Sequence, residues 1–293
     1  MAERSTEQTD APEDTAASAD QWRSVVESLD EASWPADRDY VASGRSRTRG
    51  HNAAGPAVFP GAVLLVGHRG KVVFHHASGS RSLVPDVTPL ERDMVFDVAS
   101  LTKAVVTTTL VMQLLERNKL KLDQKISQLL QGFGTMGKEH MSIRHLLTHS
   151  SGYPAHLPFY KRVQELDRGE RAGIMATRAA LEMVYQEIYR TRLEHLPGRV
   201  ATYSDVGYLL LGKVVEVLSG GKPLDRLAQE LIFTPLGMRS SGFIELAKLK
   251  RRGLAPVTSV IVPTADCPWR GKVLCGEVYD DNAWAVGGVA GHA

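Results

Sequence analysis

Cysteine is scarce in this chain of 293 residues, which contains only Cys267 and Cys275. The two lie eight positions apart, form no C-x-x-C pair, and have no histidine pair at metal-ligand spacing beside them. This pattern supports neither a zinc site nor a disulfide framework. We therefore expect two free thiols, no metal and no cofactor.

Long apolar runs are absent as well. No stretch approaches the roughly 18 consecutive apolar residues that cross a membrane as a helix. The first twenty residues contain six acidic residues, one arginine and no apolar run, and that composition is unlike a secretory signal or a transit peptide. The sequence predicts a cytoplasmic protein without a membrane span.

Strong charge of one sign is the third absence. The formal net charge is +2 and there is no block rich in lysine and arginine, so nothing favours binding to nucleic acid. With 43% hydrophobic and 23% charged residues, the composition is that of an ordinary globular protein. The expected partner is a small molecule, and the sequence gives no sign of the oligomeric state.

Composition and periodicity divide the chain into four regions. Residues 1–55 have the composition of a disordered tail and a basic, glycine-rich linker, with a short amphipathic helix at 21–34. Residues 56–95 contain two β-branched runs, 62–66 and 71–76, on either side of a short turn, which predicts a β-hairpin. Because a lone hairpin is not stable, it must pair with strands from elsewhere.

The third region, residues 96–240, is predicted to be helical, and the fourth, residues 241–293, to be irregular. In the first helix, apolar residues recur at helical spacing and predict its core-facing side. That side consists of Leu101, Ala104, Val105, Thr108, Met112 and Leu115. Further helices are expected at 141–149, 178–193, 206–221 and 223–238.

A serine and a lysine lie one helical turn apart at the start of the first helix, in the S-x-x-K pattern of Ser100 and Lys103. Chance supplies about one such match in a chain of this composition. A second match, Ser219 and Lys222, contains a Gly pair and precedes a proline, so no helix holds that lysine over that serine. Only Ser100 and Lys103 are expected on one helix face.

This placement suits nucleophilic catalysis. A serine hydroxyl is a weak nucleophile at neutral pH and needs a base within hydrogen-bond reach. Lys103 is positioned to act as that base or as a fixed positive charge. On these four residues alone, a helix-capping serine with a surface lysine is the simpler interpretation.

A tyrosine just ahead of another helix supplies context. Tyr203, Ser204 and Asp205 precede the helical run that starts at 206, and a tyrosine placed there can act as a general base or acid in a cleft. An ammonium beside a phenol favours the phenolate form. By itself, Tyr203 is equally consistent with a packed aromatic side chain.

Other patterns in the sequence give weaker support for a metal site or for a different class of enzyme. His145 and His149 have i, i+4 spacing, but no H-E-x-x-H pattern accompanies them, so a structural role is preferred over a metal site. No G-x-S-x-G elbow, P-loop or G-x-G-x-x-G occurs. Those absences disfavour an α/β-hydrolase, a nucleotidase and a dehydrogenase.

Several blocks in order carry a family resemblance. They are PGAVLLV (60–66), FDVASLTK (96–103), IRHLLTHSSGY (143–153), YSDVGYLLLG (203–212), IFTPLGM (232–238) and DDNAWAVGGVAGHA (280–293). With these blocks the chain, over about residues 56–293, resembles the serine β-lactamase-like superfamily of class C β-lactamases, D,D-peptidases and related esterases. The resemblance implies an α+β fold, an α/β sandwich plus a helical domain, of the β-lactamase/transpeptidase-like type.

The resemblance also implies roles. Ser100 would be the acylated nucleophile, Lys103 its activator and Tyr203 the proton shuttle, with the Ser100 N–H as half of an oxyanion hole. The family often has Asn at the position of Asp205. A carboxylate there is expected to pair with Lys103 and keep it protonated, which moves the base role toward Tyr203. It also makes the site less favourable for a β-lactam carboxylate.

The family's third motif, K-T-G or H-x-G, is not found in the chain as given. We therefore expect the remaining strands and the terminal helix to be missing from this chain. The preferred function is a carboxylesterase acting on a small ester through an acyl-enzyme. The alternatives are a β-lactamase or D,D-peptidase, and a catalytically inactive truncated fragment.

Overall fold

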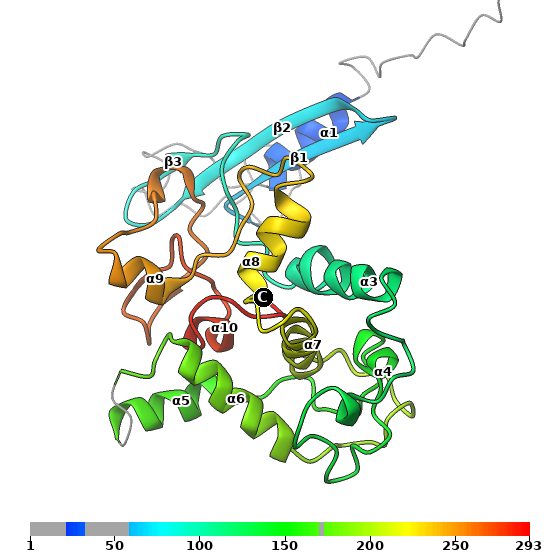
Figure 1. Cartoon of the computed structure of the whole chain (residues 1–293). Helices are drawn as coiled ribbons and strands as arrows, with labels where there is room; N and C mark the ends of the chain where they lie inside the picture. Colours follow the sequence, from blue (N-terminus) through cyan, green and yellow to red (C-terminus); the bar gives the residue numbers. More distant parts are fainter. Residues whose placement is uncertain (1–21, 33–58, 170–172) are drawn as a thin grey trace, which may run out of the picture. The chain divides into compact units, whose positions relative to one another are not determined.

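The computed structural model describes residues 22–32, 59–169 and 173–293. These residues fall into two compact units, which divide between Met94 and Val95 (Figure 1). The tail predicted at 1–20 and the linker predicted at 43–56 lie outside the described residues. The boundaries predicted for the four regions stay a prediction.

The first unit is a three-stranded antiparallel sheet with one helix. Strands β1 (Gly61–His68) and β2 (Lys71–Ser82) form the predicted hairpin, and β3 (Thr88–Pro89) pairs with the other side of β2. The hairpin turn consists of Arg69 and Gly70, both with positive φ, as the tight turns favoured by strand twist require. The hairpin prediction is confirmed.

Helix α1 (Arg23–Ala32) packs on β2 within this unit. The Trp22 ring stacks on Phe74 at 4.8 Å between centroids, and the Ser78 hydroxyl donates to Asp30 at 2.5 Å. An amphipathic helix was predicted over 21–34, and the structure confirms it.

The second unit is built around α7 (Asp205–Leu218). Ten of its fourteen residues are buried, and a helix that is apolar on all sides belongs in a core. Its neighbours are a helical turn with π geometry, Lys103–Thr108, and the helices α3, α4, α6 and α8 (Figure 1). Those helices span Thr109–Glu116, Ile143–Leu147, Arg178–Arg190 and Leu224–Ala228.

The remaining elements of this unit are short. Helices α5 (Phe159–Arg168) and α10 (Asp281–Ala285) pack against each other, and α9 covers Leu246–Arg251. A second π turn covers Gln229–Phe233, 3-10 turns cover Ile126–Gln128 and Thr258–Val260, and β4 (Asp266–Cys267) pairs with β5 (Lys272–Val273). Both cysteines are free thiols, as predicted.

The core-facing side predicted for the first helix is wrong. Leu101 and Met112 are 62% and 61% exposed, whereas Leu110 and Leu114 are buried. Two causes combine: the helix is apolar on nearly every side, so spacing alone does not choose a face, and the π turn at Lys103–Thr108 changes the phase of the residues around it.

The segment that ends at Ala293 packs closely against α7, and two glycines allow this close contact. A Cβ at Gly291 would lie 2.4 Å from the carbonyl oxygen of Tyr208, and a Cβ at Gly212 would lie 3.2 Å from the Cα of Gly291. Only glycine leaves room for the two backbones at this distance. This contact brings the segment ending at Ala293 to the first turn of the Ser100 helix.

Candidate active site

The candidate nucleophile lies on a tight turn just before the helix. Ala99 has φ of 44°, an unusual conformation for a residue with a Cβ. The Asp97 carboxylate holds this turn, since it accepts the Ala99 N–H at 2.9 Å and the Tyr279 N–H at 2.7 Å. Ser100 is exposed to solvent.

Lys103 is buried, with 5% of its side chain exposed, and has a full set of partners. Its Nζ lies 2.8 Å from Ser100 Oγ, 2.8 Å from the His292 carbonyl oxygen and 2.7 Å from Asp205 Oδ1. An ammonium donates to all three. The predicted pairing of Lys103 with Asp205 is confirmed.

Tyr203 reaches the same site from the start of α7. Ser204 caps that helix: its hydroxyl accepts the Gly207 N–H at 3.4 Å and donates to the Pro154 carbonyl at 2.7 Å. This arrangement turns the Tyr203 ring over Lys103, with Nζ 5.0 Å from the ring centroid. Within the described residues the Tyr203 hydroxyl makes no hydrogen bond, and the residue as a whole is 55% exposed.

A histidine that the sequence could only suggest as half of a metal pair lies behind Tyr203. The His149 ring packs 4.4 Å from the Tyr203 ring and 5.0 Å from the Tyr208 ring. Its Nδ1 accepts the Ser204 N–H at 3.0 Å. Burial, with the nearby charge of Lys103, lowers the pKa of His149 below its usual value, so the neutral ring is favoured.

His149 predicts a dependence of stability on pH. The unfolded chain takes up a proton at this residue near pH ~6.5, and the folded chain only at lower pH. The stabilisation is therefore complete above about pH 6.5 and is lost as pH falls through the folded pKa. Between about pH 8 and about pH 5, the free energy of unfolding measured with urea should fall more in the wild type than in His149→Asn.

Asparagine is the matched replacement at this position. It retains an acceptor for the Ser204 N–H and tolerates the φ of 54° that His149 adopts. Other titrating groups, His145 among them, are present in both proteins and cancel in the comparison. Equal losses in the two proteins would show that His149 titrates alike in the folded and unfolded chains.

The other histidine of that pair has a different task. The Nδ1 of His145 accepts the Ser142 N–H at 3.2 Å and completes a capping box at the start of α4. Elsewhere in the site, His156 Nδ1 lies 3.6 Å from Asp205 Oδ2. Among the described residues, no group of three or more His, Cys, Asp or Glu is arranged to hold a metal ion.

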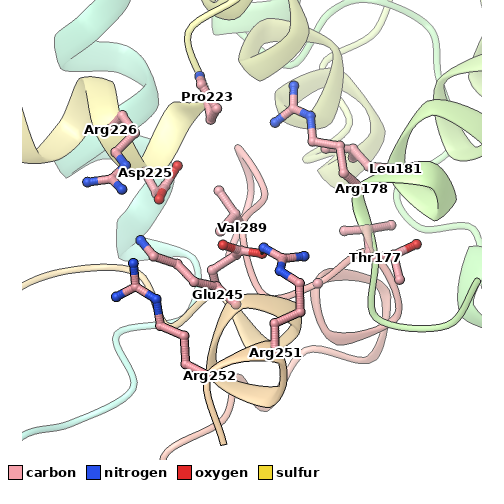
Figure 2. A pocket seen from close by; sticks show the side chains of 13 residues that line it. Thr177, Arg178, Leu181, Pro223, Asp225, Arg226, Glu245, Arg251, Arg252 and Val289 are labelled. Carbon is pink, nitrogen blue, oxygen red and sulfur yellow. The ribbon is translucent and has the colours of Figure 1, made fainter. Parts of the chain in front are cut away.

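A basic cavity of about 470 Å³ lies elsewhere in this unit, between α6, α8, α9 and residues 286–289 (Figure 2). Arg226, Arg251 and Arg252 are among the residues that line it, and all three are exposed. Neither Ser100 nor Lys103 lines it. This cavity is therefore separate from the serine-lysine pair.

All four residues predicted for the site lie together in the second unit. Ser100, Lys103 and Asp205 are joined by direct contacts, and Tyr203 is joined to them through its ring face. The second S-x-x-K match differs as expected, since Lys222 pairs with Glu230 at 2.6 Å. The contact from the His292 carbonyl was missed, because no local pattern links positions 189 residues apart.

Comparison with known proteins shows the family. A family model described as Beta-lactamase matches residues 51–269. The "Putative D-alanyl-D-alanine carboxypeptidase" of Escherichia coli K12 is 31% identical over 258 residues, which cover 80% of this chain and 56% of the relative. The "N-acetylmuramyl-L-alanine amidase" of Bacillus subtilis is 30% identical over 255 residues, with coverage of 81% and 56%. The chain belongs to the beta-lactamase family.

The fold is of the β-lactamase/transpeptidase-like type, as the sequence predicted. The octameric penicillin-binding protein homologue from Pyrococcus abyssi superposes with a TM-score of 0.57 at 21% identity, over 79% of this chain and 49% of that chain. This chain spans about half the length of the relatives that it matches. Among its described helices, none has the length and apolarity needed to span a bilayer.

Proposed function

We propose that this chain is a serine acyl-hydrolase in which Ser100 is the nucleophile. The contact between Ser100 Oγ and Lys103 Nζ, 2.8 Å, is the observation that carries the proposal. A buried ammonium at hydrogen-bond distance from an exposed serine hydroxyl supplies positive charge beside the nucleophile, and a separate base must then take the hydroxyl proton. The names of the two curated relatives, which refer to hydrolysis of amide bonds, support the same class of reaction.

The reaction has two steps. Ser100 Oγ forms a bond to the substrate carbonyl carbon and gives up its proton, the bond to the leaving group breaks, and the leaving alcohol or amine takes a proton. Water then attacks the acyl-serine and releases the acid. The Ser100 N–H, which no described group accepts, is available to the oxyanion.

Lys103 and Tyr203 divide the remaining work. Lys103 forms an ion pair with Asp205 at 2.7 Å, so its proposed role is to supply positive charge beside Ser100. Tyr203, whose hydroxyl makes no hydrogen bond within the described residues and whose ring lies over Lys103, is the proposed base.

Esters without a carboxylate next to the scissile bond are the proposed substrates. The negative charge of Asp205, with 20% of its side chain exposed, opposes a substrate carboxylate at the same place. D,D-peptidase or β-lactamase activity is the second candidate, and the name of the Escherichia coli relative favours it.

The proposal is tested by covalent labelling and a substrate panel. An alkyl fluorophosphonate should label the purified chain, and peptide mapping by mass spectrometry should place the label on Ser100. A short-chain nitrophenyl ester should be turned over faster than a penicillin or a D-Ala-D-Ala peptide, and Asp205→Asn should narrow that difference. A folded chain that takes no label would favour the inactive-fragment alternative, and faster turnover of the penicillin or peptide would favour the second candidate.

A further inference from the structure

The third partner of Lys103 is a backbone group from the far end of the sequence. The carbonyl oxygen of His292 accepts from Lys103 Nζ at 2.8 Å in a buried contact. The neighbouring carbonyl, of Gly291, accepts from the Thr107 hydroxyl at 2.6 Å. Lys103 and Thr107 are one turn apart on a single helix face, so two consecutive carbonyls bind the first turns of the Ser100 helix.

The side chain of His292 fixes this backbone. It is 1% exposed, and its Nε2 lies 2.9 Å from Asp280 Oδ1. The same oxygen accepts the Ala283 N–H at 2.7 Å and caps α10. Burial works to raise the pKa of Asp280, but the hydrogen bond and charge of His292 outweigh it and lower that pKa to about 2. Asp280 is therefore an ionised anchor at ordinary pH.

Several other groups surround the Lys103 ammonium and contribute to its position. Asp205 contributes the opposite charge, and the Tyr203 and Tyr208 rings lie 5.0 and 5.9 Å from Nζ. His149 is close enough for its pKa to respond to the Lys103 charge. Among these groups, only Asp205 bonds Nζ as an acceptor besides Ser100, so the His292 carbonyl decides the direction in which the third N–H points.

We propose that Asp280 and His292 are positioning residues, which hold the His292 carbonyl against Lys103 and thereby aim the ammonium at Ser100. The expected effect on rate rests on the proposed function, in which Ser100 is the nucleophile. The contact between the His292 carbonyl and Lys103 does not depend on it. Without the anchor, the segment that carries the carbonyl is free to shift, and Lys103 loses one of its three acceptors. The ammonium is then no longer held in its direction toward Ser100. A displacement of about 1 Å near a reacting group can cost about 100-fold in rate.

Two substitutions at Asp280 and one beside it test the proposal. Asp280→Ala removes the acceptor and should lower the maximal rate of fluorophosphonate labelling at Ser100 by about 10- to 100-fold, with a shifted pH profile and little change in reagent binding. Asp280→Asn keeps an acceptor without the charge. Its maximal labelling rate should fall less than that of Asp280→Ala, but by at least about 3-fold. Asp281→Asn is the control, because Asp281 pairs with Arg270 at 2.6 Å and not with the site.

A measurement without turnover separates this inference from the proposed function. In protein labelled with 15N-lysine, the Nζ signal of Lys103, assigned with Lys103→Arg, should change its chemical shift in both Asp280 variants and be unchanged in Asp281→Asn. No labelling of wild-type Ser100 would count against the proposed function alone. Wild-type lysine signals and labelling rates in Asp280→Asn, or in folded Asp280→Ala, would overturn the positioning role.

Discussion

Replacement of Ser100 by alanine is expected to abolish fluorophosphonate labelling and to lower ester turnover by about 10³-fold or more. Removal of a serine nucleophile leaves only the rate enhancement from substrate binding and oxyanion donors. Folding should change little, because Ser100 is exposed and exposed substitutions usually alter stability by about 0.5 kcal/mol or less. The measurements are labelling by mass spectrometry, nitrophenol release and thermal unfolding.

Ser219→Ala is the matched control for this experiment. Ser219 is the first residue of the other S-x-x-K match, but it follows the end of α7, and Lys222 there bonds Glu230. The control protein should label and turn over as the wild type does. Equal turnover by Ser100→Ala and wild type would remove Ser100 from the mechanism, and the proposed chemistry with it.

The sequence predicted those features that depend on neighbours along the chain. The hairpin followed from two β-branched runs and a short turn, and α7 from an apolar run that starts after Ser204, its N-cap. The pairing of Lys103 with Asp205 was also anticipated, because the family blocks place both residues in one site. In each case, a local pattern or an ordered set of blocks contained the information.

Features that depend on long-range packing were not predicted. The buried side of the first helix was assigned wrongly, since Val105 and Val106 are equally apolar and only Val106 is buried. His149 gave no signal of its position between two tyrosine rings. The contact of the His292 backbone with Lys103 depends on the close approach of Gly291 to α7, which no sequence period indicates.

Replacement of Glu216 by alanine is expected to destabilise the fold by about 3 kcal/mol. Glu216 is 3% exposed on α7, where its two oxygens accept both terminal nitrogens of Arg178 and the N–H of Leu224, the latter at 2.9 Å. It therefore ties α7 to the first residues of α6 and α8. Removing one partner of a buried pair costs about 3–5 kcal/mol, and the Arg178 side chain, 43% exposed, can turn to water, so the lower end applies.

Two further variants test whether the burial of Glu216 causes the expected loss of stability. Glu216→Gln keeps an acceptor for the Leu224 N–H and loses the charge, so an intermediate loss of about 1–2 kcal/mol is expected. Glu182→Ala removes an ion pair with Lys213 of 2.8 Å, but the Glu182 side chain is 48% exposed, and exposed pairs contribute about 0–1 kcal/mol. Urea unfolding gives all three free energies of unfolding. If Glu216→Ala and Glu182→Ala lower the free energy of unfolding equally, an ion pair contributes as much at the surface as in the core. The buried carboxylate of Glu216 would then not be what holds the three helices together.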